Sequence, residues 1–253
     1  MAGDASTIDS DLYQEEYKPS FVDKWDELID WEGRAAGEGD FFPRLLREAG
    51  CEKILDAACG TGYHSVQLAR AGFDVLAADG AAEMLRKTEE NAEAYGVSIP
   101  TAQADWRTLT DDLDGKFDAV LCLGNAFTHL FDEQERIETL AQFHAVLRPG
   151  GLLVLDQRNY DSILDEGFST KHQYYYCGDG VEARPEEITD EYVRFRYSFP
   201  DGEVHHLTLC PIRQDYVKGL MEQVGFSGVR RFGDFQEDYD KLDPDFIIHV
   251  ATA

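Results

Sequence analysis

The stretch KILDAACGTG (residues 53–62) decides the fold of this chain. A short apolar run that ends at Asp56 predicts a buried strand, and HSVQLARAG (64–72) after it has the apolar spacing of a helix. Glycines between the two allow backbone conformations that a Cβ forbids and let the main chain approach a ligand. Because open α/β sheets bind ligands at such turns, residues 56–62 are predicted to form the binding turn of an α/β domain.

The sequence of this turn disfavours the common phosphate-binding loops. Ser65 stands where the dinucleotide fingerprint G-x-G-x-x-G needs its third glycine, and no Lys-Ser/Thr pair of a P-loop is present in the turn. A dinucleotide-dependent oxidoreductase is therefore a disfavoured alternative.

Strand and helix patterns alternate after the turn, which predicts βαβ units and a parallel sheet covered on both faces. The pattern includes a helix of about five turns that we expect to end at Pro149 and Gly150–Gly151. The predicted fold class is α/β: a doubly wound, seven-stranded, mostly parallel sheet with an inserted antiparallel β segment. Its later strands are expected in 73–80, 98–106, 117–125, 152–160, 226–235 and 245–253.

The chain is expected to divide into four segments. Apolar spacing before the turn predicts two helices separated by the glycine-rich residues 32–40, and the Tyr, Val and Thr content of the insertion predicts antiparallel strands with turns at 178–180 and 200–202. The expected segments are an N-terminal helical lid (1–50), a cofactor-binding core (51–167), an inserted substrate lid (168–210) and a C-terminal completion of the core (211–253).

The charge of the chain restricts its partners. Fifty acidic and 23 basic residues give a net charge of −27, with the acids spread along the whole sequence. This charge disfavours binding to nucleic acid or to an anionic membrane, since both are bound through an excess of Lys and Arg. A dispersed acidic surface is typical of cytosolic proteins that work in high salt, where ions screen the repulsion. The alternative is an ordinary acidic protein.

Cysteine usage and the N-terminus both favour a cytoplasmic protein. The five cysteines show neither close pairing nor the spacing of metal ligands, so we expect reduced thiols and no metal. The acidic residues 1–19 have no apolar signal core, and no stretch approaches the roughly 20 apolar residues of a membrane span. A monomer or small homo-oligomer is expected.

Residues after the second and third predicted strands could hold a nucleoside. Asp79 ends a strand seventeen residues after Gly62, where an acid can accept both hydroxyls of a ribose. Asp105 and Trp106 follow the next strand and offer a partner for an exocyclic amine and a cover for a ring. Asp79 could instead cap a helix and Trp106 could belong to the core, but three successive strand ends favour a ligand.

Polar residues after the fourth and fifth strands could hold a small substrate. Asn125, His129 and Arg158 are expected to converge on one mouth. The guanidinium of Arg158 can grip a carboxylate with two parallel hydrogen bonds, and its alternative is a structural ion pair. A lone histidine is often a packing or surface residue, and we assign His64 to that class and His249 to a structural role in a strand.

Taken together, these segments resemble the glycine/sarcosine N-methyltransferase family of class I S-adenosylmethionine-dependent methyltransferases. The resemblance runs from about Tyr17 to the last residue. The turn by itself is typical of all class I methyltransferases, whereas the Leu-Gly-Asn-x-Phe-x-His-Leu and Arg-Asn-Tyr-Asp segments are more specific. The motifs that carry it are 56–62, Asp79, Asp105-Trp106, CLGNAFTHL (122–130) and LDQRNYD (155–161).

The resemblance implies roles for individual residues and a cofactor. Arg34 would pair with the methionine carboxylate, and Tyr197 would lie over the substrate, with the three tyrosines 174–176 as further candidates. Asn125, His129 and Arg158 would face the substrate. The implied cofactor is S-adenosylmethionine, with S-adenosylhomocysteine as product and no metal. The implied cofactor-binding residues are Tyr17, Trp25, Arg34, Ala58, Gly60, Asp79, Asp105, Trp106 and Leu123.

The resemblance implies methylation of glycine and sarcosine, giving sarcosine and dimethylglycine as the first steps of glycine betaine synthesis. An osmolyte pathway agrees with the acidic composition of a salt-adapted protein. Methyl transfer is an in-line displacement by a neutral amine, so we assign no obligate general base and keep His129 as a candidate for proton handling. The alternatives are a glycine-only enzyme that controls the methyl-donor pool, a sarcosine/dimethylglycine enzyme, and a non-catalytic cofactor-binding fold.

Overall fold

The computed structural model describes residues 8–170 and 178–253. The tyrosines 174–176, candidates from the sequence, lie outside the described residues. Among the described residues, no helix has the length and apolar character needed to cross a membrane.

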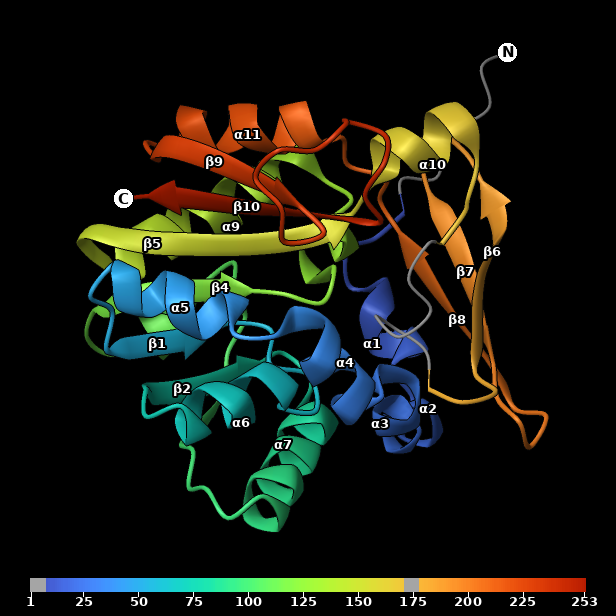
Figure 1. The fold of residues 1–253 in the computed structure, drawn as a ribbon, viewed down its shortest axis with the longest axis horizontal. Helices are drawn as coiled ribbons and strands as arrows, with labels where there is room; N and C mark the ends of the chain where they lie inside the picture. Colours follow the sequence, from blue (N-terminus) through green and yellow to red (C-terminus); the bar gives the residue numbers. More distant parts are fainter. Residues whose placement is uncertain (1–7, 171–177) are drawn as a thin grey trace.

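A seven-stranded sheet forms the centre of the molecule (Figure 1). Its strand order is β3-β2-β1-β4-β5-β10-β9, and β10 is antiparallel to both of its neighbours while β1 to β5 are parallel. The doubly wound, mostly parallel sheet predicted from the sequence is confirmed. The strands are β1 (Lys53–Asp56), β2 (Asp74–Asp79), β3 (Thr101–Gln103), β4 (Phe117–Cys122), β5 (Leu147–Arg158), β9 (Ser227–Gly233) and β10 (Phe246–Thr252).

Helices cover both faces of the sheet because its central strands are apolar on both sides. On one face Ile54 and Leu121 pack with residues of α5, α6 and α7, and on the other Leu55 and Val120 pack with α9 and α11. These helices are α5 (Phe41–Glu48), α6 (Tyr63–Arg70), α7 (Ala82–Ala94), α9 (Glu133–Val146) and α11 (Gln214–Gln223). Short helices that follow α5 are α8 (Leu109–Asp112), the 3-10 turn η1 (Ala126–His129) and α10 (Tyr160–Glu166).

The helix before β5 is shorter than predicted. It spans 14 residues, or about four turns, and ends at Val146. The Arg148-Pro149-Gly150-Gly151 segment instead belongs to the first part of β5, which begins at Leu147.

The insertion forms a separate antiparallel sheet of β6 (Glu182–Ile188), β7 (Val193–Ser198) and β8 (Val204–Leu209). Alternate residues of β7 are buried, among them Phe195 and Tyr197. They share a third apolar cluster with Phe21 and Leu28 of the N-terminal helices. The inserted antiparallel segment expected from the sequence is therefore present. The boundaries of the four expected segments stay a prediction.

In the described residues from position 8 on, four short helices precede α5: α1 (Leu12–Glu16), α2 (Pro19–Asp23), α3 (Trp25–Ile29) and α4 (Trp31–Glu38). Figure 1 shows α1 to α3 between the carboxyl ends of the large sheet and the three-stranded sheet. The expectation that residues 32–40 separate two helices is wrong, because most of this segment is α4. The Asp30 side chain caps α4 by accepting the Gly33 N–H at 3.2 Å, and the buried Trp31 and Arg34 offset the low helix propensity of glycine.

Candidate active site

The turn after β1 needs glycine at two positions. Gly60 and Gly62 have φ values of 55° and 90°, in the left-handed region that favours glycine. A Cβ on Gly62 would also lie 2.9 Å from Cγ2 of Thr88 on α7, so the turn packs closely on that helix. This packing brings the main chain of the turn to the edge of a cavity.

The cavity lies at the carboxyl ends of the parallel strands and encloses roughly 900 Å³, its open mouth included. Its wall is formed largely by the glycine turn, the residues at and after the ends of β2, β3 and β4, and helices α1, α3 and α4 of the N-terminal segment, for which we keep the name lid. All the residues that the family resemblance assigned to the cofactor contribute to this wall. They are Tyr17, Trp25, Arg34, Ala58, Gly60, Asp79, Asp105, Trp106 and Leu123.

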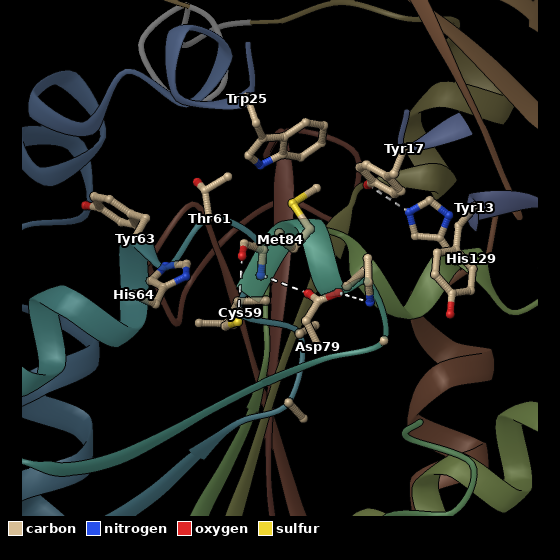
Figure 2. A pocket seen from close by; sticks show the side chains of 18 of the residues that line it. Tyr13, Tyr17, Trp25, Cys59, Thr61, Tyr63, His64, Asp79, Met84 and His129 are labelled. Carbon is tan, nitrogen blue, oxygen red and sulfur yellow. Dashed lines mark hydrogen bonds between the residues drawn. The ribbon is translucent and has the colours of Figure 1, made fainter. Parts of the chain in front are cut away.

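Asp79 lies at the bottom of the cavity in Figure 2. Its two carboxylate oxygens accept the backbone N–H groups of Gly60 at 3.0 Å and Ala81 at 2.9 Å. Burial raises the pKa of Asp79 to about 6, although both of these hydrogen bonds act to lower it. Because Asp79 is half-buried and lines the cavity, its carboxylate can accept further hydrogen bonds from a diol.

Asp105 is held by an arginine that the sequence analysis did not single out. Nε of Arg107 lies 3.0 Å from both carboxylate oxygens of Asp105, and the same guanidinium reaches Asp11 and Glu135 at 2.8 Å each. Burial acts to raise the pKa of Asp105, but the hydrogen bonds from Arg107 keep it below its ordinary value. Arg107 thereby joins the third strand end to the start of α1 and to α9. The spacing of two residues between Asp105 and Arg107 was the available signal.

Arg34 belongs to a buried cluster of polar side chains with Glu38 and His64. Its Nε lies 2.6 Å from Oε1 of Glu38, and Oε1 is also 3.1 Å from Nε2 of His64. Burial acts to raise the pKa of Glu38, but the charges of His64 and Arg34 lower it to about 2. Sequence reasoning missed Glu38 and assigned His64 to packing or the surface, whereas His64 lines the cavity.

Tyr17 and His129 meet on the opposite side of the cavity (Figure 2). The Tyr17 hydroxyl lies 3.1 Å from Nε2 of His129, and the ring of Tyr17 meets that of Trp25 edge-on at 5.2 Å. Tyr13, which the sequence analysis did not select, also lines this side. Burial lowers the pKa of His129 to about 4, so its imidazole is neutral at physiological pH.

The described residues of the cavity wall do not include Asn125, Arg158 or Tyr197. All three are buried: Asn125 lies between Gly124 and Ala126 of the wall, Tyr197 lies in β7, and Arg158 ends β5 and lines a separate small pocket. The amide of Asn125 donates to the Tyr160 hydroxyl at 3.0 Å and accepts the Arg158 backbone N–H at 2.9 Å. Asn125 therefore joins the two strand ends. Of the three residues expected to converge on one mouth, His129 lines the cavity, and the convergence of the other two on it stays a prediction.

The guanidinium of Arg158 lies among aromatic rings. Its carbon is 4.7 Å from the ring centre of Phe195 in β7 and 5.2 Å from that of Phe246 in β10. Tyr197 lies two residues along β7 and is 4% exposed. The inserted sheet thus covers the end of β5 where Arg158 lies.

Comparison with known proteins decides the family. Residues 54–151 match a methyltransferase domain model. The chain is 56% identical to glycine/sarcosine N-methyltransferase of Aphanothece halophytica, covering 96% of this chain and 92% of the relative. It is 54% identical to the enzyme of the same name from Halorhodospira halochloris, covering 96% and 91%.

The chain belongs to the glycine/sarcosine N-methyltransferase family. Its fold is also that of a crystallised S-adenosylmethionine-dependent methyltransferase from Clostridium acetobutylicum, with a TM-score of 0.74 at 18% identity over 92% of this chain and 97% of the other. In this family member the cavity at the glycine turn joins residues of the lid to three successive strand ends. The resemblance drawn from the sequence is confirmed.

Proposed function

We propose that this chain transfers methyl groups from S-adenosylmethionine to the nitrogen of glycine and then of sarcosine, giving sarcosine and dimethylglycine. The observation that carries the proposal is one cavity whose wall combines Asp79, Trp106 and the glycine turn with the Tyr17–His129 pair. The first three suit a nucleoside, and the pair suits a small polar acceptor beside it. The names of the close relatives agree with this reaction.

The residues of the cavity fit the methyl donor. Asp79 offers a half-buried carboxylate for the ribose hydroxyls, and Trp106 and Asp105 offer a ring and an acceptor for adenine. Arg34, with its guanidinium beside Glu38, would hold the methionine carboxylate. When bound, S-adenosylmethionine supplies an electrophilic methyl group on a sulfonium.

The acceptor end must bind a small zwitterion and present a neutral amine. We assign the substrate carboxylate to Arg158, since a planar guanidinium binds a carboxylate through two hydrogen bonds. Asn125 and Tyr197 position this end, the former through the Arg158 backbone. Neutral His129 and the Tyr17 hydroxyl can hold the amine hydrogens, which helps to align the lone pair of the nitrogen.

The wider role proposed for the chain is osmolyte synthesis in a salt-adapted cytoplasm. A net charge of −27 suits a protein whose surface charges are screened by salt, and dimethylglycine is one methylation short of glycine betaine. We propose a monomer or small homo-oligomer that needs no metal, nucleic acid or membrane.

A product assay tests the reaction. Glycine, sarcosine and dimethylglycine are each incubated with the protein and S-adenosylmethionine, at several KCl concentrations, and products are identified by mass spectrometry. The proposal expects sarcosine and dimethylglycine from glycine, and dimethylglycine from sarcosine. A product series that stops at sarcosine would establish a glycine-only enzyme. Tight binding of S-adenosylhomocysteine with no product from any acceptor would establish a non-catalytic fold.

A further inference from the structure

Asp26, the second residue of α3, connects the lid to the glycine turn. Its Oδ1 accepts the hydroxyl of Thr61 at 2.6 Å and the indole N–H of Trp31 at 3.1 Å. Thr61 lies between Gly60 and Gly62 in the turn and lines the cavity. The carboxylate therefore joins α3 and α4 of the lid to the segment that shapes the cofactor side of the cavity.

The second oxygen of Asp26 connects the same lid to α7. Oδ2 accepts the side-chain amide of Asn91 at 2.9 Å, and Nζ of Lys87 lies 3.6 Å away. The Asn91 amide also donates to the carbonyl oxygen of Thr61 at 2.9 Å. Asp26, Thr61 and Asn91 thus form a closed triangle of hydrogen bonds between the lid, the turn and α7.

The residue before Asp26 is Trp25, and Figure 2 shows its ring at the top of the cavity, opposite Asp79. Nε1 of Trp25 would lie 3.8 Å from a Cβ placed on Gly60. Holding the Asp26 carboxylate on Thr61 therefore fixes the adjacent indole over the glycine turn. Because α3 has only five residues, its own backbone hydrogen bonds stabilise it weakly, and contacts with other segments hold it in place.

The hydrogen bonds of Asp26 come from a hydroxyl, an indole and an amide, and these donors are neutral. Salt screens pairs of exposed charges strongly but affects short hydrogen bonds from neutral groups much less. A connection of this kind can hold the lid in the high salt for which an acidic surface is suited.

We propose that Asp26 is a positioning residue that holds Trp25 closed over the cofactor and so sets the rate at which the cofactor leaves. It acts through Thr61 and Trp25. The proposal rests on the proposed function for the identity of the cofactor. Hydrogen bonds to a charged acceptor are strong enough for their loss to weaken binding by roughly tenfold to a hundredfold.

The test compares Asp26→Ala with Glu27→Ala, which removes the neighbouring carboxylate, 56% exposed, from the same helix. Binding of S-adenosylhomocysteine is measured by calorimetry, and its dissociation by stopped-flow tryptophan fluorescence, at low and high KCl. Asp26→Ala should raise the Kd and the dissociation rate by roughly tenfold or more at both salt concentrations. It should raise the KM for the cofactor and leave kcat at saturating cofactor near that of the wild type. Glu27→Ala should change none of these by more than about twofold.

A double-mutant cycle of Asp26→Ala and Thr61→Val distinguishes loss of the positioning contact from a general loss of structure. Thr61→Val removes the hydroxyl that Asp26 accepts without changing α3, and it should raise the dissociation rate in the same direction even where Asp26→Ala does not fold. The double variant should dissociate no faster than Asp26→Ala alone. The proposal is overturned if Asp26→Ala leaves the dissociation rate of S-adenosylhomocysteine unchanged. If Asp26→Ala does not fold, the same result in Thr61→Val overturns it. Additive effects of the two changes on the dissociation rate would also overturn it. Because these readouts need no acceptor, a wild type without turnover refutes the proposed function and leaves this inference standing.

Discussion

The hydroxyl of Tyr17 and Nε2 of His129 lie 3.1 Å apart at one side of the cavity. Tyr17 follows helix α1 of the lid, and His129 ends the 3-10 turn after β4. The lid and the fourth strand end thus meet at the side assigned to the methyl acceptor. Moving the two segments apart would break this hydrogen bond.

Tyr17→Phe should therefore affect the acceptor more than the cofactor. The phenylalanine ring keeps the contact with Trp25, while the hydrogen bond to His129 is lost. We expect kcat/KM for sarcosine to fall by roughly tenfold and the Kd of S-adenosylhomocysteine to change by less than about twofold. Steady-state kinetics and calorimetry on the two proteins measure both quantities. A larger effect on cofactor binding than on kcat/KM would contradict the assignment.

His129 should make the protein less stable in mild acid. Its folded-state pKa of about 4 lies below the ordinary 6.5, so protonation favours the unfolded chain. The stability that the neutral imidazole contributes to the folded protein is complete above pH 6.5. It is lost as the pH falls from about 6.5 to about 4, and the loss is on the order of 3 kcal/mol. His249, buried in β10 with a pKa also lowered to about 4, is the matched control.

Urea unfolding between pH 4 and 8 checks this prediction. His129→Gln and His249→Gln should each reduce the loss of stability in acid, and the pH dependence should fall by a similar amount in both. Only His129→Gln should lower turnover, because only His129 of the two lines the cavity among the described residues. An unaltered pH dependence in His129→Gln would show that its imidazole is not neutral in the folded protein.

The cofactor should bind more weakly below pH 6. Burial raises the pKa of Asp79 to about 6, above the ordinary 3.8, so the protein without cofactor takes up a proton as the pH falls through 6. Ribose hydroxyls donate to the charged form, so binding lowers this pKa and releases the proton. The Kd of S-adenosylhomocysteine should rise by up to about tenfold for each pH unit below 6.

Calorimetry in two buffers of different ionisation enthalpy measures the released proton directly. Near pH 6 the wild type should release a fraction of one proton on binding, and Asp79→Asn should release none and bind with a flat pH profile. The sign of the stability effect is opposite to that of binding: without ligand, the penalty for the buried charge is present above pH 6 and disappears as the pH falls from 6 to 3.8. Proton uptake on binding would refute the role of Asp79.

The sequence predicted the large sheet because each central strand is a continuous apolar run followed by a helix pattern, and strand ends in a parallel sheet meet at one edge. Asp79 and Asp105 could be placed at the cavity for that reason alone, whereas Leu123 was indicated only by the family resemblance. The helix α4 was not predicted, because local glycine content indicated a break while the burial of Trp31 and Arg34 favours a helix.

Residues that act through contacts between distant segments left no such pattern. Asp26 and Thr61 are 35 positions apart, and Arg107 and Asp11 are 96 apart. Asn125 shows the opposite case. Its motif indicated a substrate contact, which stays a prediction, and contacts that the motif did not indicate join its amide to the backbone of Arg158 in β5 and to Tyr160 in α10.

Replacing Arg107 should weaken cofactor binding, although the residue proposed to contact the cofactor is Asp105. Removing the guanidinium in Arg107→Ala frees the Asp105 carboxylate and breaks the ion pairs to the start of α1 and to α9. We expect the Kd of S-adenosylhomocysteine to rise by roughly tenfold. The control is Arg86→Ala, a residue that is 45% exposed and outside the described cavity wall. Its guanidinium also has three carboxylate partners, Asp23, Glu83 and Glu90.

Calorimetry on both variants decides between a local and a general effect of lost ion pairs. Arg86→Ala should stay within about twofold of the wild-type Kd, since exposed ion pairs contribute little. Equal losses of affinity in the two variants would mean that Arg107 has no special role at the cavity.

Arg158 should control affinity for the acceptor and leave the donor unaffected. Arg158 is 4% exposed and its guanidinium packs against Phe195 and Phe246, so its position at the end of β5 is fixed before the substrate binds. Arg158→Ala should raise the KM for glycine and sarcosine by roughly a hundredfold, since a bidentate, charge-assisted contact is lost. Arg158→Lys keeps the charge without the planar fork and should recover only part of this loss. Binding of S-adenosylhomocysteine by both variants should match the wild type, and thermal unfolding checks that each is folded. If the variants lose affinity for the acceptor and for S-adenosylhomocysteine equally, or for neither, Arg158 does not bind the substrate carboxylate.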